Sequence, residues 1–141
     1  MQDRPAKTPF ALDGIEHVLL LVNGMEDALA FYEHALGATV ESRLPQHAMA
    51  ELRVGRSHLD LVDISAQQGA WAKPRVAGGR NVDHVAIRVD AADEAALRRH
   101  LAACGVEIAE ERIEETPDGN SLSLYIRDPS GNTLELMTRS K

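Results

Sequence analysis

Several residue types and patterns are scarce in this 141-residue chain, and each shortage excludes a class of protein. The single cysteine, Cys104, excludes an intramolecular disulfide. No apolar stretch is long enough to span a bilayer, and Met1–Phe10 lacks the apolar segment of a secretion signal. The net charge of −7 leaves no basic surface for nucleic acid. We therefore expect a cytoplasmic protein that binds neither nucleic acid nor membranes and acts on a small molecule.

The chain contains an internal repeat. Residues 15–22 read Ile-Glu-His-Val-Leu-Leu-Leu-Val, and residues 82–89 read Val-Asp-His-Val-Ala-Ile-Arg-Val. A helical pattern follows each segment; Asn23 and the Asp90–Asp93 stretch are placed to cap the helix starts, and Gly37 and Gly105 to end the helices. Alternating patterns then predict strands near 38–43, 47–53 and 57–63, and near 106–114, 120–127 and 132–138. Each half is therefore predicted to be β-α-β-β-β, which makes the fold class α+β.

Length and composition fit one domain built from these two halves. With 44% hydrophobic and 26% charged residues, the chain is typical of a globular protein that can bury a real core. We predict a single domain over 13–138, with modules 13–64 and 81–138 joined by a linker 65–80 and preceded by an N-terminal arm 1–12.

Strand alternation places four chemically interesting side chains on equivalent faces. His17 and His84 lie near the start of the two halves, and Asp60 and Glu135 lie near their ends, each between apolar neighbours. Successive strand residues point to opposite faces, and the aliphatic face of each strand belongs under the helix. All four side chains are therefore expected on the side away from the helices.

Two imidazoles and two carboxylates form a ligand set for Zn, Ni, Mn, Co or Fe(II). For any one of these residues taken singly, a satisfied core histidine or an ordinary surface acid is the favoured interpretation. Because the pattern occurs twice, we favour the metal-ligand interpretation. His58, two residues before Asp60 on the same face, is a weaker candidate ligand.

These motifs, together with Phe31-Tyr-Glu-His-Ala-Leu-Gly37 and Asp128-Pro-Ser-Gly-Asn-Thr-Leu-Glu-Leu136, resemble the vicinal oxygen chelate superfamily. That superfamily includes glyoxalase I, fosfomycin-resistance thiol transferases, extradiol dioxygenases and bleomycin-binding proteins. The resemblance implies a curved mixed sheet around a metal cleft, a homodimer, and His17, His84 and Glu135 as metal ligands. The glyoxalase-type fourth position, a Glu, falls on the shorter Asp60, which could bind the metal directly, bind through water, or support another ligand.

The short glyoxalase I-type members are the most similar, and they imply a metal-dependent lyase or isomerase for a small oxygenated substrate, such as a thiol adduct of a 2-oxoaldehyde. Glu135 and Asp60 are then the candidates for moving the proton. Arg88, Ser123 and Tyr125 are candidates for substrate contact by their strand parity. Arg88 could equally be a charge at the rim, and Tyr125 a packing residue.

Two alternatives remain open. Two histidines and one carboxylate also suit an Fe(II)-dependent extradiol-type dioxygenase, in which Asp60 would not be a ligand. A non-enzymatic antibiotic- or metabolite-binding protein of the bleomycin-resistance type is disfavoured by the aromatic content of only 4%. The sequence leaves open the substrate, the metal, and whether one chain or two chains form the cleft.

Overall fold

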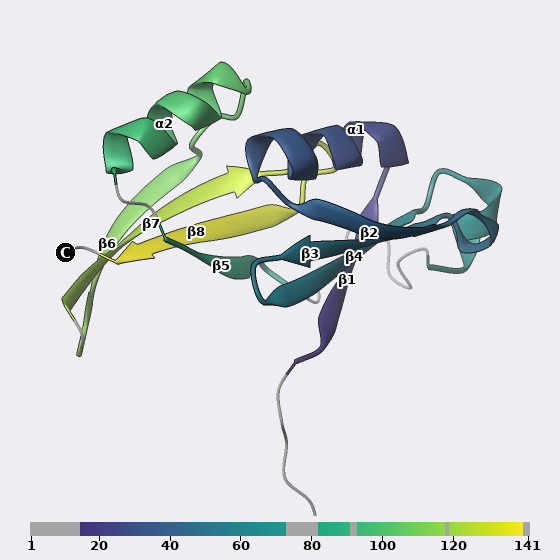
Figure 1. Ribbon diagram of the computed structural model, residues 1–141, viewed down its shortest axis with the longest axis horizontal. Coiled ribbons are helices and arrows are strands. Elements are labelled where there is room, and N and C mark those ends of the chain that lie inside the picture. Colours follow the sequence, from purple (N-terminus) through teal and green to yellow (C-terminus); the bar gives the residue numbers. More distant parts are fainter. Residues whose placement is uncertain (1–14, 73–81, 91–92, 118, 140–141) are drawn as a thin grey trace, which may run out of the picture.

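The computed structural model describes residues 15–72, 82–90, 93–117 and 119–139, and it contains the predicted β-α-β-β-β arrangement twice (Figure 1). The first module consists of β1 (His17–Val22), α1 (Met25–Ala30), β2 (Thr39–Leu44), β3 (Met49–Val54) and β4 (Ser57–Asp63). The second consists of β5 (Val85–Val89), α2 (Glu94–Ala103), β6 (Glu110–Thr116), β7 (Gly119–Arg127) and β8 (Thr133–Arg139). The predicted α+β class is confirmed.

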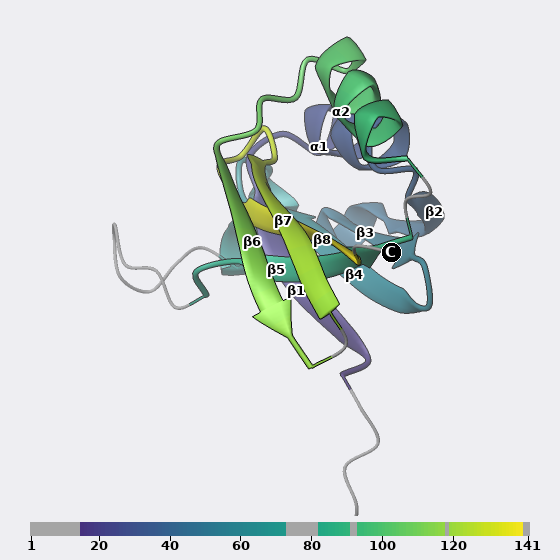
Figure 2. The ribbon, with the colours of Figure 1, turned by 90° about the vertical axis from the view of Figure 1, so that its left-hand side faces the viewer.

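The strands form two four-stranded sheets of identical topology rather than one continuous sheet. Their orders are β1-β4-β3-β2 and β5-β8-β7-β6. The first strand of each module runs parallel to the last, and the remaining pairs are antiparallel, so both sheets are mixed. Figure 2 shows α1 and α2 on the same side of the molecule, so neither of these helices covers the opposite side of the two sheets.

The helix ends match the sequence expectations at three of four positions. Gly37 and Gly105 adopt positive φ angles of 70° and 72°, which ends each helix in the conformation that glycine tolerates best. Asp93 caps α2 by accepting a hydrogen bond from the Ala95 amide at 2.9 Å. Asn23 does not cap α1, contrary to our expectation. Instead the carboxylate of Asp63, at the end of β4, accepts the amides of Gly24 and Met25.

One hydrophobic core runs through both modules. Strand residues that face the helices fill it, among them Val22, Leu61, Leu124 and Leu136. The π-helical turn η1 (Phe31–Ala35), which extends α1, adds the fully buried Tyr32, whose hydroxyl donates to Asp128 at 2.9 Å. This bond links the helix of the first module to the β7–β8 turn of the second.

Strand boundaries differ from the predicted ones mainly in β6, which begins at Glu110 rather than at residue 106. Short 3₁₀ turns lie at Pro45–His47 (η2) and at Gln67–Ala72 (η3), the latter within the predicted linker. The predicted arm 1–12 and residues 73–80 of the linker lie outside the described residues. None of the helices described here has the length and apolar character needed to cross a membrane.

Candidate metal centre

The first module brings His17 and Asp60 together. His17 begins β1, and Asp60 lies on the adjacent parallel strand β4, where it pairs in register with Leu19. The Nε2 atom of His17 lies 3.5 Å from Oδ2 of Asp60. Asp60 is only 5% exposed, whereas His17 is open to solvent. A buried carboxylate thus stands beside an accessible imidazole.

The second module repeats this pair with a longer carboxylate. His84 directly precedes β5, and Glu135 lies on the parallel neighbour β8, in register with Ala86. The Nε2 atom of His84 lies 3.1 Å from Oε1 of Glu135, which is also 5% exposed. Equivalent positions of the two sheets therefore carry equivalent pairs.

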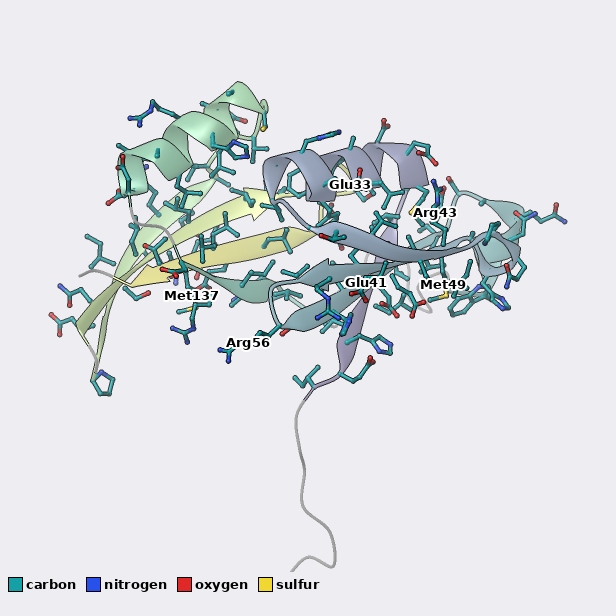
Figure 3. All side chains as sticks on the ribbon, viewed as in Figure 1. Glu33, Glu41, Arg43, Met49, Arg56 and Met137 are labelled. Carbon is teal, nitrogen blue, oxygen red and sulfur yellow. The ribbon has the colours of Figure 1, made fainter. Side chains whose placement is uncertain are left out.

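Both pairs lie on the sheet faces opposite α1 and α2, as strand alternation predicts. The residues flanking each carboxylate, such as Leu59 and Leu134, belong to the core beneath the helices. Met49 shares a face with Asp60 through the β3–β4 register, and Met137 shares one with Glu135 on β8. Figure 3 shows both methionines on the side of the sheets opposite the helices.

An acidic residue precedes each histidine and binds its other ring nitrogen. Glu16 pairs with Nδ1 of His17, and Asp83 lies 2.8 Å from Nδ1 of His84. The hydrogen bond to Glu16, followed by the charge of Asp60, raises the pKa of His17. A carboxylate on Nδ1 fixes the ring and leaves Nε2 for the opposite carboxylate or a metal. Sequence reasoning missed this role, although the repeated acid–histidine dipeptide was visible.

The pair in the second module is held by neighbouring side chains. Ser123 on β7 donates its hydroxyl to Oε2 of Glu135 at 2.9 Å, and Tyr125 meets the ring of His84 edge-on at a centroid distance of 5.6 Å. The guanidinium of Arg112 lies 5.6 Å above the ring of Tyr125. Two of the predicted substrate-contact residues, Ser123 and Tyr125, thus contact the proposed metal ligands themselves.

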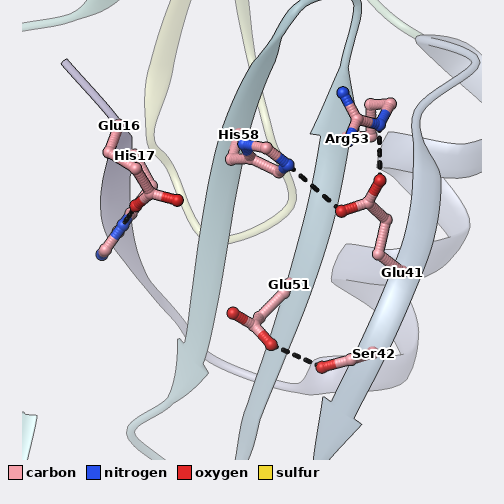
Figure 4. Close-up of polar contacts among 7 residues, drawn as sticks. All are labelled: Glu16, His17, Glu41, Ser42, Glu51, Arg53 and His58. Carbon is pink, nitrogen blue, oxygen red and sulfur yellow. Dashed lines mark hydrogen bonds and ion pairs between the residues drawn. The ribbon is translucent and has the colours of Figure 1, made fainter. Parts of the chain in front are cut away.

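The pair in the first module has a different environment. Glu51 on β3 lies in register with Asp60 and accepts the hydroxyl of Ser42 at 2.5 Å (Figure 4). Burial raises the pKa of Asp60, and the like charge of Glu51 raises it further, while His17 acts in the opposite direction. Asp60 is therefore more readily protonated than an ordinary aspartate.

His58, the weaker candidate ligand, contacts a different acid. Its Nε2 lies 3.1 Å from Oε2 of Glu41, which also pairs with Arg53 (Figure 4). Glu41 lies at an irregularity in the β2–β3 register between Val40 and Ser42. Neither Glu41 nor Arg53 carried a sequence signal, because the register shift that places Glu41 arises only on folding.

Each pair has the separation expected of two neighbouring metal ligands. Ligands bound at about 2.1 Å and at right angles lie about 3 Å apart, close to the observed nitrogen–oxygen distances. In the described parts of the chain, however, no three His, Cys, Asp or Glu side chains form a group that could hold a metal. The chain therefore carries two separate histidine–carboxylate pairs, and the four predicted ligands do not meet within it.

Arg88 lies in neither pair. It lines a cavity of about 510 Å³ between the modules, together with Val18, Leu59 and Ile87, and with Arg56 of the β3–β4 turn. Among the described residues, Arg88 and Arg56 have no ion-pair partner. The seam between the modules thus combines apolar walls with two available guanidinium groups.

Comparison with known proteins supports the fold and the family. The family model described as Glyoxalase/Bleomycin resistance protein/Dioxygenase superfamily matches residues 14–136. A lactoylglutathione lyase from Agrobacterium tumefaciens is 26% identical, with a TM-score of 0.63 over 93% of this chain and 96% of that one.

Two further solved structures share the fold. A structure from the mobile metagenome of V. Pseudocholerae has a TM-score of 0.71 at 23% identity, covering 95% of this chain and 100% of its own. A mutant of the fosfomycin resistance protein FosX from Listeria monocytogenes, in complex with Mn(II) and 1S,2S-dihydroxypropylphosphonic acid, has a TM-score of 0.66 at 17% identity. That comparison covers 89% of this chain and 90% of the FosX chain.

Proposed function

Because the chain belongs to the Glyoxalase/Bleomycin resistance protein/Dioxygenase superfamily, we propose that it is a divalent-metal-dependent lyase or isomerase of the glyoxalase I type. The observation that carries this proposal is the pair of histidine and carboxylate side chains built twice, on equivalent strands and with similar separations. Imidazole nitrogen and carboxylate oxygen together suit Zn, Ni, Mn, Co or Fe(II).

The proposed centre is completed by a second copy of the chain. Each histidine–carboxylate pair is a proposed half-site on the sheet face opposite the core, and a two-fold dimer can place the His17 half-site of one copy against the His84 half-site of the other. Ile15 is 82% exposed and Val82 is 55% exposed, and each lies two residues before a proposed histidine ligand. Covering these apolar side chains would favour association.

In this arrangement His17, His84 and Glu135 hold the metal, with Asp60 as a fourth ligand or as the base. When bound, a divalent ion supplies Lewis-acid stabilisation of negative charge on the substrate oxygens. Asp60 and Glu135 are the carboxylates that take a proton from one carbon and return it to its neighbour, so that the product is an isomer of the substrate. Arg88 offers an anionic substrate group a charged partner at the seam.

Metal titration tests the centre directly. His17→Ala and His84→Ala should each weaken Zn(II) or Ni(II) binding by more than about 100-fold, because each removes one of few ligands. His34→Ala, on the helix side, is the matched control and should bind metal as the wild type does. Wild-type protein that binds none of Zn, Ni, Mn, Co or Fe(II) would contradict the proposal.

Mixing the two variants tests whether copies share the centre. If they do, refolding His17→Ala with His84→Ala at equal amounts should restore about a quarter of the wild-type sites, because half of the dimers are mixed and each mixed dimer has one intact centre. A centre formed within one chain would remain empty in every mixture.

The catalytic assay uses methylglyoxal with a panel of thiols, and the product is the corresponding thioester. Metal-loaded wild-type protein should form it, whereas Glu135→Gln should not.

One observation favours a second candidate, the Fe(II)-dependent extradiol-type dioxygenase: Asp60 faces Glu51 and is held differently from Glu135, which suits a three-ligand centre. Oxygen consumption with catechols by the Fe(II)-loaded protein would identify that activity.

A further inference from the structure

Ser123 lies directly behind the carboxylate of the second half-site. It is 0% exposed on β7, and its hydroxyl donates to Oε2 of Glu135 at 2.9 Å. The other carboxylate oxygen, Oε1, is the one that faces His84 at 3.1 Å. The two oxygens of Glu135 thus have separate partners: Oε2 binds Ser123 on β7, and Oε1 faces His84, the other proposed ligand of the pair.

Because Ser123 is fully buried, it does not suit the substrate-contact role that the sequence predicted for it. A hydroxyl with no exposed surface in a single chain has no path to a bound small molecule without rearrangement of the sheet. Its partner, by contrast, is a buried carboxylate that needs a donor, because an unpaired charge away from water is costly. A hydrogen bond to an ionised acceptor is also among the stronger and more directional ones.

We propose that Ser123 is a positioning residue for the metal centre: it holds Oε2 of Glu135 and so directs Oε1 towards the metal. This inference rests on the proposed metal-binding function. Partners outside the coordination sphere orient metal ligands and commonly change metal affinity by about 10- to 100-fold when removed.

The first half-site has no equivalent of the Ser123–Glu135 hydrogen bond. This difference suggests different roles for the two carboxylates. Among the described residues, no hydroxyl donates to Asp60, and the nearest equivalent, the Ser42 hydroxyl on β2, binds Glu51, the cross-strand neighbour of Asp60. Glu135 is therefore the fixed ligand of the centre, whereas Asp60 has the freedom to bind and release. Ser123 is the side chain that creates this difference.

Ser123→Ala tests the proposal, with Ser121→Ala as its matched control. Ser121 lies on the same face of β7, is 5% exposed, and donates its hydroxyl to the Thr138 carbonyl rather than to a ligand. Competition titration with Zn(II) and Ni(II) should show about 10- to 100-fold weaker binding for Ser123→Ala and wild-type binding for Ser121→Ala. Thermal unfolding of the metal-free proteins reports any general loss of structure.

The same substitution in a Glu135→Ala background separates positioning from packing. If Ser123 acts through Glu135, removing its hydroxyl there should cost no further metal affinity. Ser123→Cys, with similar volume and a weaker donor, should bind metal with intermediate affinity and serves if Ser123→Ala does not fold.

Three results would overturn this inference: unchanged metal binding in Ser123→Ala and Ser123→Cys, an equal loss in Ser121→Ala, or a full loss in the Glu135→Ala background. Each leaves the proposed function intact, provided that the wild type binds metal. Wild-type protein that binds no metal would overturn both the proposed function and the inference that rests on it.

Discussion

The two modules share one topology but differ in how firmly each helix is attached. In the first, Met25, Ala28 and Leu29 of α1 are buried, and Asp63 of the same module's last strand anchors the helix start. In the second, all residues of α2 are described and Leu101 alone is buried, while the cap comes from the adjacent Asp93. A repeated strand and helix order therefore does not imply repeated packing, because packing depends on side chains that diverge independently.

The histidine–carboxylate pairs differ in the opposite direction, because the carboxylate of the second module is the more firmly held. The carboxylate of the second module is held by a buried hydroxyl, whereas the carboxylate of the first faces another acid. The module with the better-packed helix thus carries the less firmly held ligand pair. If the proposed centre forms, the two halves contribute unequally to it.

The largest expected effect is the difference in stability lost when an apolar side chain is truncated in each helix. Leu29→Ala removes a side chain that is 5% exposed and is expected to lower the free energy of unfolding by about 3 kcal/mol. Leu97→Ala, in the half-buried stripe of α2, should cost only about 1 kcal/mol. Urea unfolding measures both, and equal losses would mean that α2 is packed as firmly as α1.

The next largest loss of stability is expected when the hydrogen bond between the modules, from Tyr32 to Asp128, is removed. Asp128 accepts hydrogen bonds from the Tyr32 hydroxyl, the Ser130 amide, and both the amide and the side chain of Asn132. Burial, together with the nearby Asp128 carboxylate, raises the pKa of Tyr32 well above its ordinary value, so the hydroxyl remains a donor. Asp128→Ala should cost about 2 to 3 kcal/mol, because several donors lose their acceptor.

Tyr32→Phe is the control for this contact, since it removes a single bond, and should cost about 1 kcal/mol. Arg56→Ala in the corresponding β3–β4 turn should be nearly neutral, because Arg56 is exposed. A loss at Arg56 as large as that at Asp128 would show that both turns connect the modules.

The two helix caps offer a comparison that depends on pH. Burial alone would raise the pKa of Asp63, but hydrogen bonds from the Ser65 hydroxyl and from the Gly24 and Met25 amides hold it below its usual range. Asp63→Ala should cost about 2 kcal/mol at neutral pH, and Asp93→Ala, at an exposed cap, at most about 1 kcal/mol.

Because the folded pKa of Asp63 lies below the unfolded one, its stabilisation is fully present above the unfolded pKa of about 4. It is lost as the pH falls through the lower folded value. The difference between wild type and Asp63→Ala in urea unfolding should therefore shrink in that acidic range. A difference that grows on acidification would contradict this assignment of the cap.

The smallest expected effect concerns the acid that faces Asp60. Glu51→Gln removes a like charge, so the pKa of Asp60 in the metal-free protein should fall while burial still keeps it raised. Carboxyl chemical shifts followed through an NMR titration report this change. Glu33→Gln, on the outer helix side, is the control and should leave Asp60 unaltered (Figure 3).

Much of the fold could be predicted because local sequence patterns indicate where strands and helices begin and end. Alternation identified the strands and the faces of His17, Asp60, His84 and Glu135, and the glycines at 37 and 105 marked the helix ends. The cap of α1 could not be predicted, because local chemistry favoured Asn23 while Asp63 reaches the same amides through the β1–β4 pairing. Boundaries such as the start of β6 depend on a strand partner and not on composition.

The amino-acid sequence was enough to establish the duplication and the strand faces of His17, Asp60, His84 and Glu135, since side-chain alternation and a repeated motif are local properties of the chain. Folding was needed to bring each histidine beside its carboxylate, to keep the two pairs apart within the described chain, and to place Ser123 next to Glu135 and Glu51 next to Asp60. The physical reason is that these facts depend on which strands become neighbours and in which register, and cross-strand contacts are fixed only when the sheets assemble.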